Sequence, residues 1–181
     1  CEITLLLPQQ AVARVVQSVL DHGESHTRFH LAMANLDSRD RLEFVVEKSV
    51  ELGVISIGLV STKHASLRHH AVERLEAKLI AAMKQSKRAI LPSLFVFSSL
   101  ANAVDHYRSM NHIVCDPSGT EPSPIHDECC IWVGPEGGFS ENELTLLTGL
   151  PHVYRWFLGS ARLRAETAAI AALAHCASRT V

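Results

Sequence analysis

Two short segments of the sequence combine residue types at spacings that could support chemistry. The first is Gly134–Gly138, which follows an apolar run and precedes Ser140. Glycines adopt backbone conformations closed to other residues and let a ligand approach main-chain N–H and C=O groups. The segment has neither the lysine of a phosphate-binding loop nor the spacing of a dinucleotide-binding loop. It therefore predicts either a site for another small molecule or a tight turn that simply requires glycine.

The second segment runs from Leu158 to Ala168 and places Arg162, Arg164 and Glu166 between an apolar run and an alanine-rich helix. Charged side chains beside an apolar region need partners or a function. One interpretation is that Glu166 pairs with an arginine and stabilises the helix N-terminus, where negative charge is favourable. The other is that the two arginines stabilise an anion that develops during a reaction. The sequence leaves both interpretations open.

The remaining charged residues, histidines and cysteines have structural interpretations that require no function. Met83–Arg88 ends a helix, where basic residues complement the macrodipole, so we expect a solvated helix end. Glu47–Glu51 is expected to be an exposed helix face. The histidines show no ligand spacing with a carboxylate or thiol, and the five cysteines are scattered. We therefore expect no metal site, and we expect the cysteines to be reduced.

Length and composition favour a globular protein with one main domain. The chain has 181 residues, of which 47% are hydrophobic and 20% are charged. The formal net charge of −2 argues against a protein held to nucleic acid by bulk charge, although a local basic patch stays open. No apolar run reaches the length of a membrane span, and the first residues lack the basic region of a signal peptide. We therefore expect a cytoplasmic protein without a membrane span.

Along the chain, short β-branched runs alternate with helical periodicity, which predicts an α/β fold with a mostly parallel sheet. The expected strands are Cys1–Leu7, Phe29–Ala34, Val54–Ser61, Leu94–Phe97, Ile113–Asp116, Cys129–Val133 and Val153–Leu158. The expected helices are Ala11–Leu20, Arg41–Leu52 after a cap at Asp37 or Ser38, Ala71–Lys87, a helix carrying Leu100 to Tyr107, one that follows the capping box of Ser140 and Glu143, and Glu166–Ser178.

Three strand exits of this expected sheet are candidate ligand-binding positions. Ligands of parallel α/β sheets bind outside the carboxyl ends of the strands. The exits are Asp116–Gly119, Gly134–Gly138 and Leu158-Gly159. We therefore expect these three segments to lie close together around one ligand.

Four segments, in this order, resemble a known family. They are Asp40–Val54, Ala81–Ser86, Gly134–Glu143 and Leu158–Ala168, and the match covers about residues 29–178. The chain resembles the RsmE family of 16S ribosomal RNA uridine-N3 methyltransferases, within the SPOUT (trefoil-knot) superfamily. It departs from the usual family pattern at Ala161, where many members have an arginine, and at Lys84, where the usual residue is glutamate.

The resemblance implies a SPOUT-type, mostly parallel sheet flanked by helices, with a C-terminal trefoil knot. It implies S-adenosyl-L-methionine as the cofactor, a homodimer, and methylation of N3 of a specific uridine in 16S rRNA of the small ribosomal subunit. Residues 29–181 would form the SPOUT methyltransferase domain. Residues 1–28 would be the tail of an N-terminal PUA-like domain, which helps to hold RNA in this family, or a linker.

The resemblance also implies roles for individual residues. Arg164, with Arg162, would stabilise negative charge on the uracil carbonyls. Glu136 or Glu166 would take the N3 proton, or Glu166 would only orient an arginine. The implied cofactor contacts are Gly134, Pro135, Glu136, Gly137, Gly138, Leu158, Gly159 and Leu163.

Three alternatives to this activity stay open from the sequence. One is a SPOUT enzyme that methylates another RNA base or a ribose 2′-hydroxyl. Another is a non-catalytic RNA-binding domain with the same fold. The third is an α/β enzyme that acts on a small acid through the two arginines, although no nucleophile motif or metal-ligand set supports it.

Overall fold

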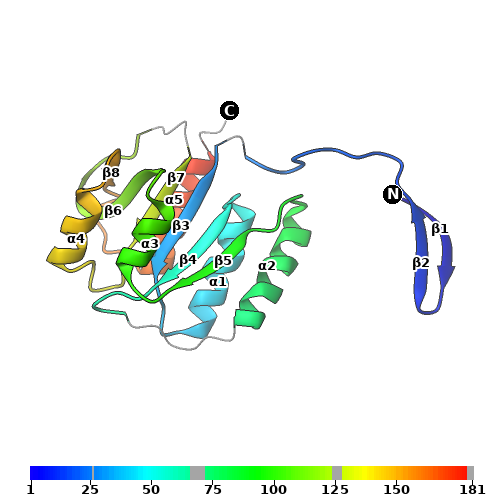
Figure 1. Cartoon of the computed structure of the whole chain (residues 1–181), viewed down its shortest axis with the longest axis horizontal. Helices are drawn as coiled ribbons and strands as arrows, with labels where there is room; N and C mark the ends of the chain where they lie inside the picture. Colours follow the sequence, from blue (N-terminus) through cyan, green and yellow to red (C-terminus); the bar gives the residue numbers. More distant parts are fainter. Residues whose placement is uncertain (26, 66–71, 124–127, 179–181) are drawn as a thin grey trace.

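The computed structural model describes residues 1–25, 27–65, 72–123 and 128–178. A six-stranded sheet with the order β5-β4-β3-β7-β6-β8 lies at its centre, and every neighbouring pair is parallel (Figure 1). The strands are β3 (Phe29–Ala34), β4 (Ser56–Val60), β5 (Ser93–Phe97), β6 (Asn111–Thr120), β7 (Cys129–Val133) and β8 (Val153–Trp156).

Helices cover both faces of this sheet. One hydrophobic core lies between the sheet and three of them, and a second core lies between the sheet and the other two. The first group is α1 (Arg39–Glu51), α2 (Val72–Ser86) and α5 (Ala165–Ala177), and the second is α3 (Leu100–Tyr107) and α4 (Glu141–Thr148). The three-layer arrangement explains the continuous apolar runs, because parallel strands are buried on both faces.

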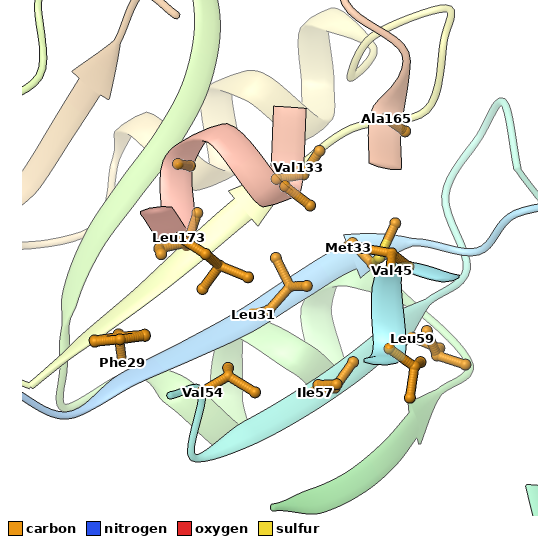
Figure 2. Close-up of a cluster of buried hydrophobic side chains, with 14 of the residues drawn as sticks. Phe29, Leu31, Met33, Val45, Val54, Ile57, Leu59, Val133, Ala165 and Leu173 are labelled. Carbon is orange, nitrogen blue, oxygen red and sulfur yellow. The ribbon is translucent and has the colours of Figure 1, made fainter. Parts of the chain in front are cut away.

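The central strand β3 shows how the two cores are divided. Phe29, Leu31 and Met33 point to the face covered by α1 and α5, where Figure 2 shows them beside Val45 and Leu173. Ala32, at the alternate position, belongs to the core under α3 and α4. This period of two is the geometry of a strand, and it places apolar atoms in both layers.

Most predicted elements are confirmed, with small shifts at their ends. The Ser38 side chain accepts a hydrogen bond from the Arg41 backbone N–H and caps α1. The capping box of Ser140 and Glu143 is present at the start of α4. The helix predicted over Ala71–Lys87 is α2, and Ala71 lies outside the described residues. The mostly parallel α/β sheet is therefore confirmed, whereas the trefoil knot stays a prediction.

The helix predicted over Ala11–Leu20 is wrong. Gln10–Arg14 is a strand, β2, that pairs antiparallel with β1 (Glu2–Leu7) across a short turn. The apolar spacing fits a helix, but pairing with β1 satisfies the backbone groups instead, a tertiary preference that local propensity does not contain. Every residue of both strands is exposed, and Figure 1 shows the hairpin apart from the six-stranded sheet.

The solvated helix end predicted at Met83–Arg88 is confirmed for Lys84 and Lys87, which are exposed, but it is wrong for Arg88. The Arg88 side chain is 2% exposed and its Nη2 lies 2.5 Å from Oε2 of Glu24, which is 5% exposed. Its Nη1 donates to the carbonyl oxygens of Val50 and Val54 at 3.0 and 2.9 Å. Glu24 accepts backbone N–H groups beyond the helix end in return. The arginine therefore joins the segment before β3 to the ends of α1 and α2.

Other expectations concern membranes, metals and thiols. Within the described parts of the chain, no helix combines the length and apolar character needed to cross a membrane. The same residues contain no group of three or more potential metal ligands. His69, His70 and His126 lie outside the described residues. All five cysteines are free, and Cys129 and Cys130 are buried in β7.

Candidate active site

A cavity of about 540 Å³ lies at the carboxyl ends of β7 and β8 and beside the middle of β6. All of Gly134–Gly138 and Leu158-Gly159 line it, with Asp116 and Pro117 from the third predicted segment, so the three segments lie close together as predicted. The third segment is not a strand exit, because β6 continues to Thr120. Its volume is in the range of sites for small molecules and cofactors. The lining residues are Cys115, Asp116, Pro117, Val133, Gly134, Pro135, Glu136, Gly137, Gly138, Phe139, Leu144, Trp156, Phe157, Leu158, Gly159, Ser160, Ala161, Arg162, Leu163, Ala165 and Ala168.

Glycine backbone forms much of one wall. Gly138 has φ of +74° and donates its N–H to the Pro135 carbonyl at 2.8 Å, which closes a tight turn. Gly159, which also lines the cavity, has φ of +127°. A Cβ added at either glycine would meet no atom within 4 Å, so it would project into open space. The glycines therefore satisfy a turn and also leave room beside the main chain.

The glycine loop, Gly134–Gly138, is held from outside by the segment that follows β4. Ser140 donates its N–H to Oε2 of Glu143 at 2.8 Å, and Oε1 of the same carboxylate accepts the Lys63 N–H at 2.8 Å. Burial alone would raise the pKa of Glu143, but these backbone hydrogen bonds lower it below its ordinary value. His64 Nδ1 lies 3.2 Å from the Gly138 carbonyl oxygen and donates to it. The segment with Lys63 and His64, which is distant in sequence, thus fixes the loop together with the start of α4.

The third wall depends on Asp116, near the middle of β6. Its Oδ1 accepts the Ser118 N–H at 2.7 Å, and its Oδ2 accepts Nη2 of Arg155 at 2.8 Å. Burial raises the pKa of this carboxyl, but the Ser118 and Arg155 hydrogen bonds outweigh it, so the net shift is downward. The strand continues to Thr120 rather than ending at Asp116, because Gly119 packs directly on the backbone of β8.

Arg41, on the first turn of α1, joins two of the predicted site residues. Its Nε donates to Oε1 of Glu166 at 2.7 Å, and its Nη2 donates to Oε1 of Glu136 at 2.5 Å. Nη2 also donates to Oε2 of Glu166, so that pair is bidentate. The Arg41 side chain is 28% exposed, against 49% for Glu136 and 9% for Glu166. The guanidinium of Arg41 therefore donates hydrogen bonds to both carboxylates.

This shared guanidinium keeps both carboxyls ionised. The Arg41 hydrogen bonds lower the pKa of Glu166, and they likewise lower the pKa of Glu136. The same contacts raise the pKa of Arg41. Neither carboxyl has a pKa raised toward neutral pH, as a general base that works at neutral pH would need.

The two predicted arginines occupy different places. Arg162 lines the cavity, and its Nη2 donates to the Glu136 carbonyl oxygen at 2.5 Å. Arg164 is the exposed N-cap residue of α5, and its side chain makes no hydrogen bond to the rest of the described chain. Glu166 lies outside the cavity lining and pairs with Arg41 instead of either predicted arginine. The pairing interpretation of Glu166 thus holds, with an arginine from another helix.

Comparison with known proteins adds independent findings. The model of the RNA methyltransferase domain matches residues 23–177. Ribosomal RNA small subunit methyltransferase E of Rickettsia conorii is 33% identical over 147 residues, which cover 75% of this chain and 59% of the relative. The protein of the same name from Mesomycoplasma hyopneumoniae is 26% identical over 180 residues, covering 94% and 78%. The chain thus spans less than two thirds of the length of the Rickettsia protein.

A solved structure is similar in three dimensions. It is the crystal structure of a ribosomal RNA small subunit methyltransferase E from Neisseria gonorrhoeae bound to S-adenosyl methionine. The TM-score is 0.81 and the identity 29%, and the match covers 95% of this chain and 74% of that one.

Proposed function

Because this chain belongs to the RNA methyltransferase family, we propose that it transfers a methyl group from S-adenosyl-L-methionine to N3 of a uridine in 16S ribosomal RNA. The single observation that carries the proposal is the convergence of the exits of β7 and β8 and the middle of β6 on one cavity lined by glycine backbone. The family match and the named relatives agree with this activity.

The cavity fits the proposed cofactor in size and chemistry. Gly138 and Gly159 leave space that any Cβ would fill, so a flat nucleoside can lie against the main chain. Apolar side chains, including Leu158 and Leu163, offer surfaces for an adenine ring. We assign cofactor contacts to the backbone of Gly134–Gly138 and of Leu158-Gly159, with Leu163 beside them. When bound, S-adenosyl-L-methionine supplies an electrophilic methyl group.

The two arginines then act on the target base. Arg164 is exposed beside the cavity and has no hydrogen-bond partner among the described residues, so its guanidinium is available to a substrate. We propose that it stabilises the negative charge that spreads onto the uracil carbonyls when N3 loses its proton. Arg162 already donates to the Glu136 carbonyl, so it aligns the loop and supports that charge from the cavity wall.

The proton of N3 goes to solvent water in this proposal. Glu136 and Glu166 share Arg41 as a hydrogen-bond donor and have lowered pKa values, which makes both weak bases. The N3 lone pair forms the new bond to the methyl carbon, and the electron pair of the broken carbon–sulfur bond stays on sulfur. Glu166 therefore positions Arg41 and the start of α5 instead of transferring a proton.

We extend the proposal to the partners of the enzyme. The substrate would be the small ribosomal subunit or its RNA, in the cytoplasm, and the enzyme would act as a homodimer. The exposed hairpin of β1 and β2, with Ile3 and Leu6 at 64% and 73% exposure, supports assignment of residues 1–28 to the tail of a PUA-like domain or a linker, whose end at Glu24 packs on the methyltransferase domain. The methyltransferase domain then spans residues 29–181.

The test has a binding arm and a product arm. Calorimetry with S-adenosyl-L-methionine should show stoichiometric binding, and absence of binding would point to a non-catalytic RNA-binding domain. Small subunits from a strain that lacks this methylation should then gain 3-methyluridine, detected by nucleoside mass spectrometry. A 2′-O-methyl nucleoside or another methylated base would refute the uridine-N3 assignment.

A variant tests the role of Arg164. Arg164→Ala should lower single-turnover methylation by about 10²–10³-fold, the usual effect of losing one charge-stabilising donor, with unchanged cofactor affinity. Arg108→Ala is the matched control, because Arg108 is exposed on the far side of the sheet from α5 and has only an exposed partner. Unchanged methylation by the Arg164 variant would refute the anion-stabilising role.

A further inference from the structure

Arg41 is the one described residue whose side chain contacts both the glycine loop and the first turn of α5 through ion pairs. Glu136 belongs to the loop, and Glu166 follows Ala165, which also lines the cavity. The guanidinium therefore stands between two walls that are otherwise joined through the contact of Arg162 with the Glu136 carbonyl. The sequence separations are large, so this contact exists only in the folded domain.

The charges around this point explain why a cation is needed. Oε1 of Glu136 and Oε2 of Glu166 both accept hydrogen bonds from Nη2 of Arg41, so the two carboxylates lie close together and their charges repel. The positive groups that face them are Arg41 from α1, Arg162 through the Glu136 carbonyl, and Arg164, whose charge acts on Glu166. Arg41 alone donates hydrogen bonds to both carboxylates.

We propose that Arg41 is a positioning residue that holds the glycine loop against α5 and so sets the width of the cofactor cavity. The proposal rests on the function proposed above, since it takes S-adenosyl-L-methionine as the ligand. Arg41 acts through Glu136 and Glu166 and does not itself touch the ligand, because it is absent from the cavity lining. Its loss separates the walls before any ligand arrives.

The arrangement leads to a pH dependence in a variant without the cation. In Arg41→Met, two unpaired carboxylates repel each other at neutral pH and the walls move apart. When one of them takes a proton, it can donate a hydrogen bond to the other and bring the walls together again. Cofactor affinity of this variant should therefore be greatest at low pH and should weaken as the pH rises. The wild type has both carboxyls paired, so these groups give it no such dependence over the same range.

The first experiment is calorimetry of the full chain with S-adenosyl-L-methionine at about pH 4.5 and about pH 8, because a glutamate carboxyl beside a like charge titrates at or above its ordinary value of about 4.3. At the higher pH, Arg41→Met should bind about tenfold more weakly than wild type, a change of about 1.4 kcal/mol. At the lower pH the deficit should shrink. Arg41→Lys keeps a positive charge but loses the bidentate geometry, so its cofactor affinity at the higher pH should lie between those of wild type and Arg41→Met.

Two matched variants separate positioning from general damage. Arg39→Met removes the neighbouring exposed arginine of α1, whose charged partners are at 3.6 and 3.9 Å, and should bind like wild type at both pH values. Arg41→Met combined with Glu136→Gln removes one of the two repelling charges and lets the amide donate to Glu166. This double variant should recover most of the affinity at the higher pH, whereas a purely structural defect would persist.

Hydrogen exchange of the protein without cofactor supplies the second readout. Amides of residues 134–140 and 158–166 should exchange faster in Arg41→Met, while those of the distant strand β5 should not change. If wild type fails to bind the cofactor, the proposed function is wrong and the exchange result still tests Arg41. If wild type binds and Arg41→Met matches it in affinity at both pH values and in exchange, the positioning role is refuted.

Discussion

Replacing Arg88 by methionine should be among the most destabilising single changes available in this domain. The change keeps most of the apolar bulk and removes a guanidinium that is 2% exposed. It breaks the ion pair with Glu24 and leaves the Val50 and Val54 carbonyl oxygens without that donor. Glu24 stays buried at 5% exposure, with its charge uncompensated except by two backbone N–H groups.

The expected size follows from this burial. Removing one member of a buried, hydrogen-bonded ion pair costs about 3–5 kcal/mol because it strands the other charge. For a domain of this size each kcal/mol lowers Tm by about 2–4 °C, so we expect a fall of about 6–20 °C. Burial would raise the pKa of Glu24, but hydrogen bonds from Arg88 and backbone N–H groups hold it below its ordinary value. The pair therefore contributes above about pH 4.3, the unfolded value, and its contribution is lost as pH falls.

Urea denaturation followed by circular dichroism measures the difference at neutral pH and again in acid. Arg108→Met is the control, because the Arg108–Asp105 pair is 75% and 79% exposed and should change stability little. Combining Arg88→Met with Glu24→Gln should recover part of the loss, since no charge is then stranded. A loss below about 1 kcal/mol for Arg88→Met would refute the reasoning, because exposed ion pairs reach that value.

Two further predictions concern the wall formed by β6 and β8. Gly119→Ala would place a Cβ 2.6 Å from the Arg155 carbonyl oxygen, so β6 and β8 must separate. We expect the free energy of unfolding, measured by urea denaturation, to fall by about 1–3 kcal/mol. A change near zero would show that the two strands can move apart at little cost. Asp116→Asn should destabilise the domain at neutral pH, because the lowered pKa of Asp116 means that its ion pair stabilises the fold above about pH 3.9 and is lost in acid. The stability curves of wild type and this variant should converge below that pH, and parallel curves would contradict the assignment.

The order of strands and helices could be predicted from the sequence because each element carries its own signal. The continuous apolar run of β7 and the capping box before α4 are local patterns, and both are confirmed. The hairpin of β1 and β2 could not be predicted, because Ala11–Leu20 has apolar residues that suit a helix as well as a strand. Only the partner strand decides between the two, and pairing is not a local property.

The candidate site divides in the same way. The glycine loop and Gly159 could be found because glycine at the exit of a parallel strand serves a turn or a ligand, and the cavity lies there. Arg41 could not be found from spacing, although it stands within a family-like segment, because its partners are 95 and 125 residues away. The burial of Arg88 could not be predicted for the same reason, since a basic residue at a helix end usually faces solvent.

The pairing of β3 with β7 has a consequence for biosynthesis. Phe29 pairs with Cys129 across β3 and β7, so one edge of β3 has no partner strand during synthesis until most of the chain has been made. An open apolar edge can recruit other nascent chains, and parallel pairing over such distances is slow. The cavity draws its lining from residues 115–168, so an incomplete chain cannot hold a nucleoside there. A small ligand of this cavity would therefore bind only complete, folded chains and would stabilise them relative to incomplete ones.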